Sequence, residues 1–246
     1  MSSQEINGPI PIAHHHDPHE FPECGLSSRS ESNNVIPTFL KIWKEKSVQD
    51  FKPDPYVATL LNCAMWSFYG LPFVHPDSIL VITINGTGFF IELAFVAIFL
   101  AFSTWPNRKM IIIFLVVEAI FLAVVAFVTL NFFHTTKARS MIVGILCIIF
   151  TISMYLSPLT VMKMVIQTKS VKYMPLCLSV ATFFNGIVWV IYALLKFDPY
   201  IVIPNGLGTF SALVQLVLYC TYYKTTKWDS DDDQKPHSEV QLSDAV

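Results

Sequence analysis

The stretches TINGTGFF at residues 83–90 and IPNGLGTF at residues 203–210 place one polar tetrapeptide, Asn-Gly-x-Gly, inside two long apolar segments. An amide side chain in an apolar environment costs about 2–7 kcal/mol if it has no hydrogen-bond partner. The same costly polar stretch occurs twice, about half the chain length apart. This recurrence suggests a duplicated unit with a paired polar site.

The composition indicates a membrane protein. Hydrophobic residues make up 53% of the 246 residues and charged residues only 14%, and a water-soluble domain cannot bury so much apolar surface. The net charge of −2 suggests neither a nucleic acid nor an acidic partner. The five cysteines show no paired spacing, and we interpret the four in apolar segments as small core residues.

Six segments are apolar over about the 20 residues that a helix needs to cross a bilayer. They are residues 55–74, 78–102, 110–133, 141–162, 174–195 and 200–223. The loops between them are short, so we expect an all-α, polytopic helical bundle. Only Lys137, Arg139 and Lys196 lie in one set of loops, whereas the other set and the chain ends are rich in basic residues. This asymmetry places the basic set in the cytoplasm.

The two halves of the chain carry the same residues in the same order. Lys-Ser-Val occurs at residues 46–48 and again at 169–171. The matched pairs that follow are Asn62 with Asn185, Trp66 with Trp189, Tyr69 with Tyr192, and Asn85 with Asn205. Polar and aromatic matches of this kind indicate an internal duplication.

The duplication predicts two parallel three-helix repeats joined by a linker helix, a 3+1+3 plan. Such repeats place a substrate site near the midplane of the membrane, where they meet. The opening helix of the first repeat maps to residues 18–39, which are too polar to span, so we expect that helix to be lost or replaced. The expected divisions are a polar, disordered segment at 1–34, a first repeat at 35–102, a linker at 103–140, a second repeat at 141–224 and an acidic tail at 225–246.

The repeated amides and indoles predict a site for a neutral polyol. An amide donates and accepts hydrogen bonds, as a hydroxyl group does, and an indole offers an apolar plane to the C–H face of a sugar. The alternative is structural: each Asn bonds to a neighbouring helix, and each Trp anchors the chain at the interface. The matched positions favour the binding site. The glycines of both tetrapeptides are expected to let helices approach closely.

Prolines and acids within the spans have their own interpretations. Pro55 and Pro175 begin spans and Pro158 lies inside one, where a missing helix hydrogen bond permits a kink, so Pro158 is a candidate hinge. Glu92 and Glu118 have no counterpart in the other repeat. We therefore expect them to bond to neighbouring helices rather than to carry protons.

The chain resembles the SWEET family of sugar transporters, of plant type, over about residues 35–224. The resemblance is carried by KPDPYVATLLNCAMWSFYGLPFVHPDSILVITINGTG, IVGILCIIFTISMYLSPLTVMKMVIQTKSVKYMPL and NGIVWVIYALLKFDPYIVIPNGLGTFSALVQLVLY. It implies an energy-independent, bidirectional uniporter that moves mono- or disaccharides by alternating access. It also implies a homo-oligomer, or a hetero-oligomer with other sugar transporters.

The resemblance also implies roles for individual residues. Asn85 and Asn205 match the family's sugar-contacting asparagines. The other residues implied at the site are Trp66, Trp189, Asn62, Asn185, Ser153 and Met154, the last of which favours a hexose. Hinge prolines match Pro55, Pro158 and Pro175, with Val35 at the fourth position, and the extracellular gate matches Tyr69, Tyr192 and Asp198.

Three alternatives stay open from the sequence. The chain is a transporter, a truncated or regulatory subunit that pairs with full-length transporters, or a membrane receptor. An enzyme is not expected, because no paired His/acid or Ser/His arrangement shares one plane. No cofactor or metal is expected, since the histidines at 14–16 and 19 fit no closed zinc motif. We expect a multi-pass protein of the plasma membrane, with the vacuole or another endomembrane as the alternative.

Overall fold

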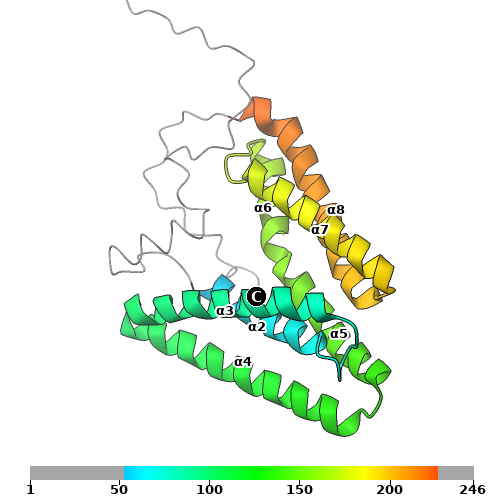
Figure 1. The fold of residues 1–246 in the computed structure, drawn as a ribbon. Coiled ribbons are helices and arrows are strands. Elements are labelled where there is room, and N and C mark those ends of the chain that lie inside the picture. Colours follow the sequence, from blue (N-terminus) through cyan, green and yellow to red (C-terminus); the bar gives the residue numbers. More distant parts are fainter. Residues whose placement is uncertain (1–52, 227–246) are drawn as a thin grey trace, which may run out of the picture.

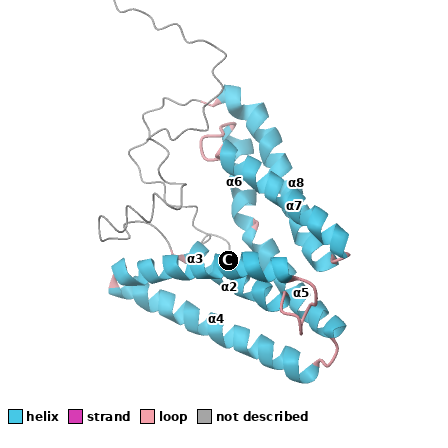
Figure 2. Ribbon diagram, in the orientation of Figure 1, coloured by secondary structure: helices cyan, strands magenta, loops and turns pink. Residues whose placement is uncertain are grey.

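The computed structural model describes residues 53–226, and every regular element in that range is a helix. The elements are α2 (Asp54–Tyr69), α3 (Ile79–Phe102), α4 (Trp105–Phe132), α5 (Thr136–Met154), α6 (Leu156–Thr168), α7 (Leu176–Lys196), α8 (Pro199–Tyr222) and the short 3-10 helix η2 (Tyr223–Thr225). Short loops connect them (Figure 2). The all-α prediction is confirmed. The expectations for residues 1–52 and 227–246, including the lost opening helix and the histidine cluster, lie outside the described residues.

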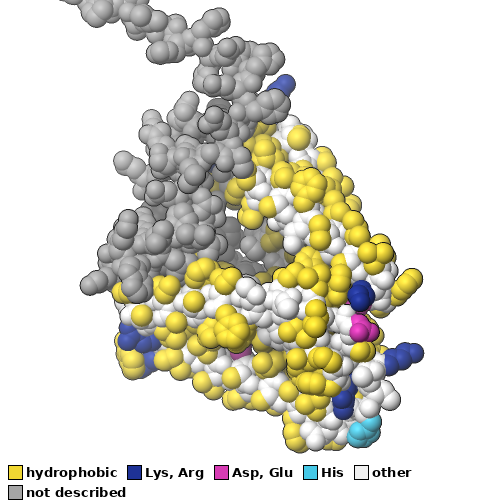
Figure 3. Space-filling model, in the orientation of Figure 1, with side chains coloured by type: hydrophobic (Ala, Val, Ile, Leu, Met, Phe, Trp, Pro, Cys, Tyr) yellow, Lys and Arg dark blue, Asp and Glu magenta, His cyan; other side chains and the backbone are white. Residues whose placement is uncertain are grey.

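Five spans within residues 53–226 are long and apolar enough to cross a membrane: α3, α4, the α5–α6 pair, α7 and α8. In the most apolar 18-residue stretch of each span, only 11–22% is buried inside the protein. Hydrophobic side chains cover much of the visible surface (Figure 3). This surface matches lipid rather than water. The expected first span, 55–74, is shorter, because α2 ends at Tyr69 before Gly70 and Pro72.

The expected span at 141–162 is not one straight helix. The α-helix α5 ends at Met154, and α6 begins at Leu156. At the break, the backbone N–H of Tyr155 donates to the carbonyl of Ile152, a tighter bond than that of an α-helix. Pro158 lies in the first turn of α6 and has no N–H to donate to the carbonyl of Met154. The break therefore lies one turn before the proline.

The helices form two groups that meet at one end and diverge at the other (Figure 1). In the first arm, α2 packs against α3 and α4; in the second arm, α8 packs against α7 and α6. The helix α5 joins the arms, because it contacts α2 and α4 on one side and α8 on the other. Since the α7–α8 pair repeats the α2–α3 pair and α4 stands between them, the order of elements agrees with the duplicated plan.

Three clusters of buried side chains correspond to the two arms and their junction. The junction cluster contains Met65, Trp66, Tyr69, Val74, Val81, Val125, Val143, Cys147, Ala193 and Ile201, from six helices and a loop. A second cluster around Phe99 lies within the first arm, and a third around Val165 lies within the second arm. The junction thus holds the arms together near the C-terminal end of α2.

Two arginines bond to the carbonyl groups at helix ends. A terminal nitrogen of Arg108 donates to the carbonyls of Ala101 and Ser103, 3.1 Å away in each case, where α3 ends. The guanidinium of Arg139 donates to the carbonyls of Phe133 at 2.7 Å and Phe73 at 3.0 Å, and to that of Leu130. Helix ends leave carbonyls unpaired, so Arg139 fixes the end of α4 and the α2–α3 loop together.

Candidate functional site

The two asparagines of the Asn-Gly-x-Gly stretches are held in the same way. The side-chain N–H of Asn85 donates to the carbonyl of Val81 at 2.9 Å, and that of Asn205 donates to the carbonyl of Ile201 at 2.9 Å. Both side chains are half-buried. In the described part of the chain, neither Oδ1 atom has a hydrogen-bond partner. Each arm therefore presents one oriented amide that is available to a ligand.

These two asparagines do not contact each other. Asn85 lies on α3 and Asn205 on α8, and these helices are not packed together within residues 53–226. They lie on separate arms, each one turn after a residue of the junction cluster, Val81 or Ile201.

Trp66 is buried and bonds across the junction to α5. Its indole N–H donates to the hydroxyl of Thr151 at 3.0 Å, and that hydroxyl donates to Oδ1 of Asn62 at 3.1 Å. Thr151 thus holds Asn62 and Trp66, which lie one turn apart on α2, in a fixed relation. The sequence did not single out Thr151, whose only signal was a hydroxyl inside an apolar span.

The matching pair in the second arm is held less tightly. Trp189 is half-buried and Asn185 is exposed. Even so, the aromatic arrangement repeats: the rings of Trp66 and Tyr69 meet edge to face at 5.4 Å, and those of Trp189 and Tyr192 at 5.7 Å. Trp189 and Tyr192 also pack against the junction cluster. The structure therefore brings both tryptophans to the junction of the arms.

The remaining expected site residues are spread along the helices. Ser153 is exposed, and its hydroxyl donates to the carbonyl of Phe150 on its own helix. Met154 is half-buried at the end of α5, beside the helix break. Pro55 lies in the first turn of α2 and Pro175 caps α7, positions where a missing N–H costs little.

The second glycine of each tetrapeptide is the closely packed one. A methyl group on Gly88 would lie 3.0 Å from the sulfur of Cys63, and one on Gly208 would overlap the hydroxyl of Tyr155. That hydroxyl donates to the carbonyl of Pro204 at 2.9 Å. Gly208 thus makes room for the residue at the α5–α6 break to bind α8 next to Asn205.

Three expectations from the sequence are wrong. A buried oxygen of Glu92 has no hydrogen-bond partner among the described residues, so the expected bond to a neighbouring helix is not formed there. A methyl group added to Gly206 would meet no described atom within 4 Å, so this glycine does not serve a close approach of helices. Cys177 and Cys220 are both exposed, so neither is a core residue, unlike Cys63.

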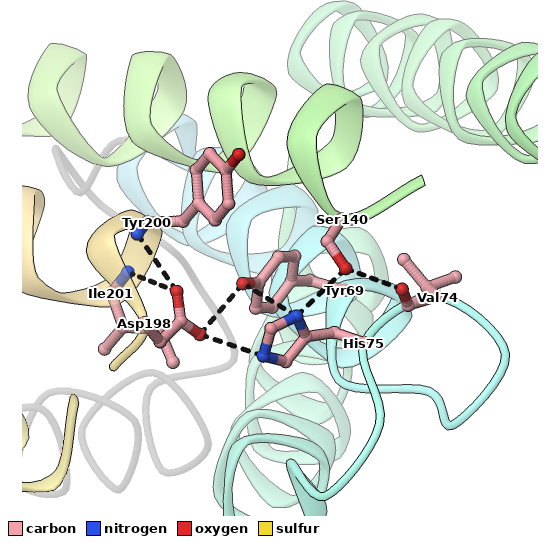
Figure 4. Close-up of polar contacts among 7 residues, drawn as sticks. All are labelled: Tyr69, Val74, His75, Ser140, Asp198, Tyr200 and Ile201. Carbon is pink, nitrogen blue, oxygen red and sulfur yellow. Dashed lines mark hydrogen bonds and ion pairs between the residues drawn. The ribbon is translucent and has the colours of Figure 1, made fainter. Parts of the chain in front are cut away.

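A polar network closes the end at which the arms meet (Figure 4). The hydroxyl of Tyr69 donates to Oδ2 of Asp198 at 2.8 Å. The other oxygen of Asp198 accepts the backbone N–H groups of Tyr200 and Ile201, which caps the start of α8. A side chain of the first arm is therefore bonded to the residue that begins the last helix of the second arm.

Two further residues belong to this network, and no sequence pattern pointed to them. His75, in the α2–α3 loop, lies with Nε2 3.3 Å from Oδ2 of Asp198 and stacks on the ring of Tyr69 at 4.8 Å. Its Nδ1 lies 2.9 Å from the hydroxyl of Ser140 in α5. Neither residue has a partner of the same type at the matched position, where the 123-residue offset pairs His75 with Asp198, so the duplication gave no signal for them.

A bundle of apolar helices with duplicated amide and indole positions around a polar closure defines a multi-pass membrane transporter. A family described as "sugar efflux transporter for intercellular exchange" (MtN3) matches residues 35–107 and 141–227. The chain belongs to this family of sugar transporters, the MtN3/SWEET family.

Individual relatives agree with this assignment. The chain is 68% identical over 200 residues to bidirectional sugar transporter SWEET5 of Arabidopsis thaliana, covering 81% of this chain and 83% of the relative. It is 56% identical over 214 residues to SWEET4 of the same plant, covering 85% of each. A solved structure of a eukaryotic SWEET transporter has a TM-score of 0.73 and 38% identity, covering 77% of this chain and 88% of that one.

Proposed function

We propose that the chain is a facilitative, bidirectional uniporter that moves a neutral sugar across the membrane without an energy source. The observation that carries the proposal is the matched pair of Asn85 and Asn205, one on each arm, each oriented by its own helix and each with an available amide oxygen. An amide oxygen accepts a sugar hydroxyl and an amide N–H donates to one. The relatives named as bidirectional sugar transporters support the same function.

The tryptophans complete the proposed site. Trp66 and Trp189 both lie at the junction, where an indole ring supplies an apolar plane for the C–H groups of a sugar ring. Thr151 fixes the indole of Trp66, so this plane is oriented before the sugar arrives. Asn62 and Asn185, one turn before each Trp, supply further amides.

The way in which the arms meet supports alternating access. Lys137 and Arg139 lie in the first turn of α5 and Lys196 ends α7, and these helix ends lie where the arms converge (Figure 1). The positive-inside rule places this end away from the cytoplasm. The bond between Tyr69 and Asp198 then closes the outer side, while the described helices diverge toward the cytoplasm. Rocking of the arms, with the break at Tyr155 and the prolines at 55, 158 and 175 as hinges, would expose the site to each side in turn.

The specific sugar, membrane and assembly are finer parts of the proposal. Met154, half-buried at the end of α5 beside the break, is a large side chain, and on this ground we propose a hexose rather than sucrose as the substrate. We place the chain in the plasma membrane. We also propose a homo- or hetero-oligomer, for which the linker helix α4 offers exposed apolar side chains such as Ile113 and Phe127.

The site is tested by Asn205→Ala, measured as uptake of radiolabelled glucose and sucrose in a transport-deficient host. We expect uptake to fall by roughly tenfold or more, because the sugar loses a hydrogen-bonding group in a partly dry site. Asn131→Ala is the matched control: its side chain makes the same bond to its own helix, 2.8 Å to the carbonyl of Phe127, but on the linker helix. Equal uptake by Asn205→Ala and wild type, at equal surface expression, would contradict the assignment.

A further inference from the structure

Pro204 weakens α8 one residue before the proposed sugar-binding amide. Proline has no backbone N–H, so inside α8 it leaves the carbonyl of Tyr200, four residues earlier, without its usual donor. The side chain of Asn205 is bonded to the carbonyl of Ile201, at 2.9 Å, in the overlapping turn. The orientation of the Asn205 amide therefore depends on a stretch of helix that lacks an ordinary α-helical bond.

The first repeat does not have this weakness. The residue matched to Pro204 in α3 is Ile84, which keeps its backbone N–H. Asn85 makes the same side-chain bond as Asn205, 2.9 Å to the carbonyl of Val81, but in a helix without a proline. The second amide, and not the first, therefore depends on support from outside its own helix.

Tyr155, at the break between α5 and α6, supports α8 from outside at this point. Its side chain is half-buried, and its hydroxyl donates to the carbonyl of Pro204 at 2.9 Å. Within residues 53–226, no side chain makes such a bond to the carbonyl of Ile84, which is 48% exposed. The external bond thus occurs on the helix that contains the proline.

The carbonyl that accepts this bond is rigidly connected to Asn205. The carbonyl of Pro204 and the N–H of Asn205 form one planar peptide group, so a bond that fixes the carbonyl also fixes the backbone that carries the amide. On the other side of the weak turn, Asp198 caps the start of α8 through two backbone N–H groups (Figure 4). The weak turn is therefore held at both ends, by Asp198 and by Tyr155.

Gly208 provides the space that the tyrosine needs. A methyl group on Gly208 would overlap the hydroxyl of Tyr155. A methyl group on the matched glycine, Gly88, would instead lie 3.0 Å from the sulfur of Cys63 on α2. The two matched glycines thus face different neighbours, and the contact with a hydroxyl is particular to the second repeat.

We propose that Tyr155 is a positioning residue for sugar binding, which orients Asn205 by holding the proline-weakened turn of α8 at the carbonyl of Pro204. This inference rests on the proposed function, because Tyr155 acts through the amide that is proposed to bind the sugar. Its single hydroxyl hydrogen is already donated to Pro204, so it has none to give to a sugar. Loss of the hydroxyl loosens Asn205 and leaves Asn85 as it is.

The first measurement is the KM for radiolabelled glucose uptake by Tyr155→Phe in a transport-deficient host. Phenylalanine keeps the ring beside Gly208 and removes only the hydroxyl. We expect the KM to rise roughly 2–13-fold, the effect of one lost hydrogen bond, with a smaller change in the maximal rate at equal surface expression. Tyr219→Phe is the matched control, because this half-buried tyrosine of α8 has no hydrogen-bond partner for its hydroxyl in the described part of the chain.

The internal repeat separates positioning from a general structural role. Asn205→Ser and Asn85→Ser each leave a hydroxyl that can bond to a sugar. Added to Asn205→Ser, Tyr155→Phe should raise the KM by less than about 1.5-fold, because the two residues act together. Added to Asn85→Ser, it should raise the KM by roughly the full 2–13-fold. If a serine variant transports too slowly for a KM, binding of glucose to the purified chain gives the same comparison.

Each outcome decides between these roles. An unchanged KM in Tyr155→Phe, or an equal rise in both serine backgrounds, overturns the inference and leaves the transport function standing. No uptake by the wild type above the Asn205→Ala background overturns the proposed function and this inference with it. If Tyr155→Phe does not reach the membrane, Tyr155→Met, which also lacks a donor, serves for the same comparison.

Discussion

At the scale of single residues, the proposed sugar site contains three amides and one indole whose orientations are fixed by short hydrogen bonds. Asn85 and Asn205 bond to their own helices, while Trp66 and Asn62 bond through Thr151 to another helix. Sugar recognition in such a site depends on groups that are oriented in advance, because ordering them on binding would cost affinity.

Thr151→Val tests this orientation. Valine has nearly the shape of threonine but neither accepts the indole N–H of Trp66 nor donates to Asn62. A typical hydrogen bond is worth about 0.5–1.5 kcal/mol, so we expect the KM for sugar to rise by roughly 2–13-fold with a smaller change in the maximal rate. Thr160→Val, in which the lost hydroxyl bonds only to its own helix, is the control.

An unchanged KM in Thr151→Val would mean that the bridge between Trp66 and Asn62 does not orient the site. A loss of maximal rate at unchanged KM would assign Thr151 to the movement of the arms instead.

The sequence identified the residues that the duplication marks twice. Asn62, Asn85, Trp66 and their partners were found because each has a polar or aromatic counterpart at a matched position. Residues without such a counterpart in the other repeat were not found. The hydrogen bonds of Thr151, and those of Ser140 with His75 and Val74, join residues 65–89 positions apart, a separation that no local pattern encodes.

At the scale of elements, the important feature is the break between α5 and α6 and its contact with α8. The proline at 158 predicted a kink, but the break lies at Tyr155, because the proline affects the carbonyl one turn earlier. Pro204 lies inside α8 without ending it. Its carbonyl instead accepts the hydroxyl of Tyr155, so the break is held beside Asn205.

Gly208→Ala and Gly206→Ala form a matched pair on α8. A methyl group at 208 would overlap the hydroxyl of Tyr155, whereas one at 206 meets no atom within 4 Å. Overpacking typically costs about 1–3 kcal/mol, and alanine in a helix gains about 0.5–1 kcal/mol over glycine. We therefore expect Gly208→Ala to lower both thermal stability and uptake, and Gly206→Ala to keep or slightly raise stability. Equal stability of the two variants would contradict the packing role of Gly208.

At the scale of the whole molecule, two arms meet through one buried cluster and one polar closure and are otherwise surrounded by apolar surface. The hydrophobic pattern and the duplication predicted the class, the linker helix and the like-oriented triplets. They did not predict that the arms converge at one end, since that depends on Tyr69, His75 and Asp198 meeting across the molecule. The same closure supports the proposed gated carrier rather than an open channel.

Binding of a neutral sugar between matched amides, with release to either side, is the property on which the proposed function depends. Counterflow in proteoliposomes of the purified chain alone is its sharpest test: vesicles loaded with unlabelled glucose are diluted into a trace of labelled glucose, with no ion gradient. We predict transient accumulation of label in the wild type and in Asn131→Ala, and its loss in Asn85→Ala and Asn205→Ala. Absence of counterflow in the wild type, or full counterflow in both site variants, would show that the matched amides do not carry sugar.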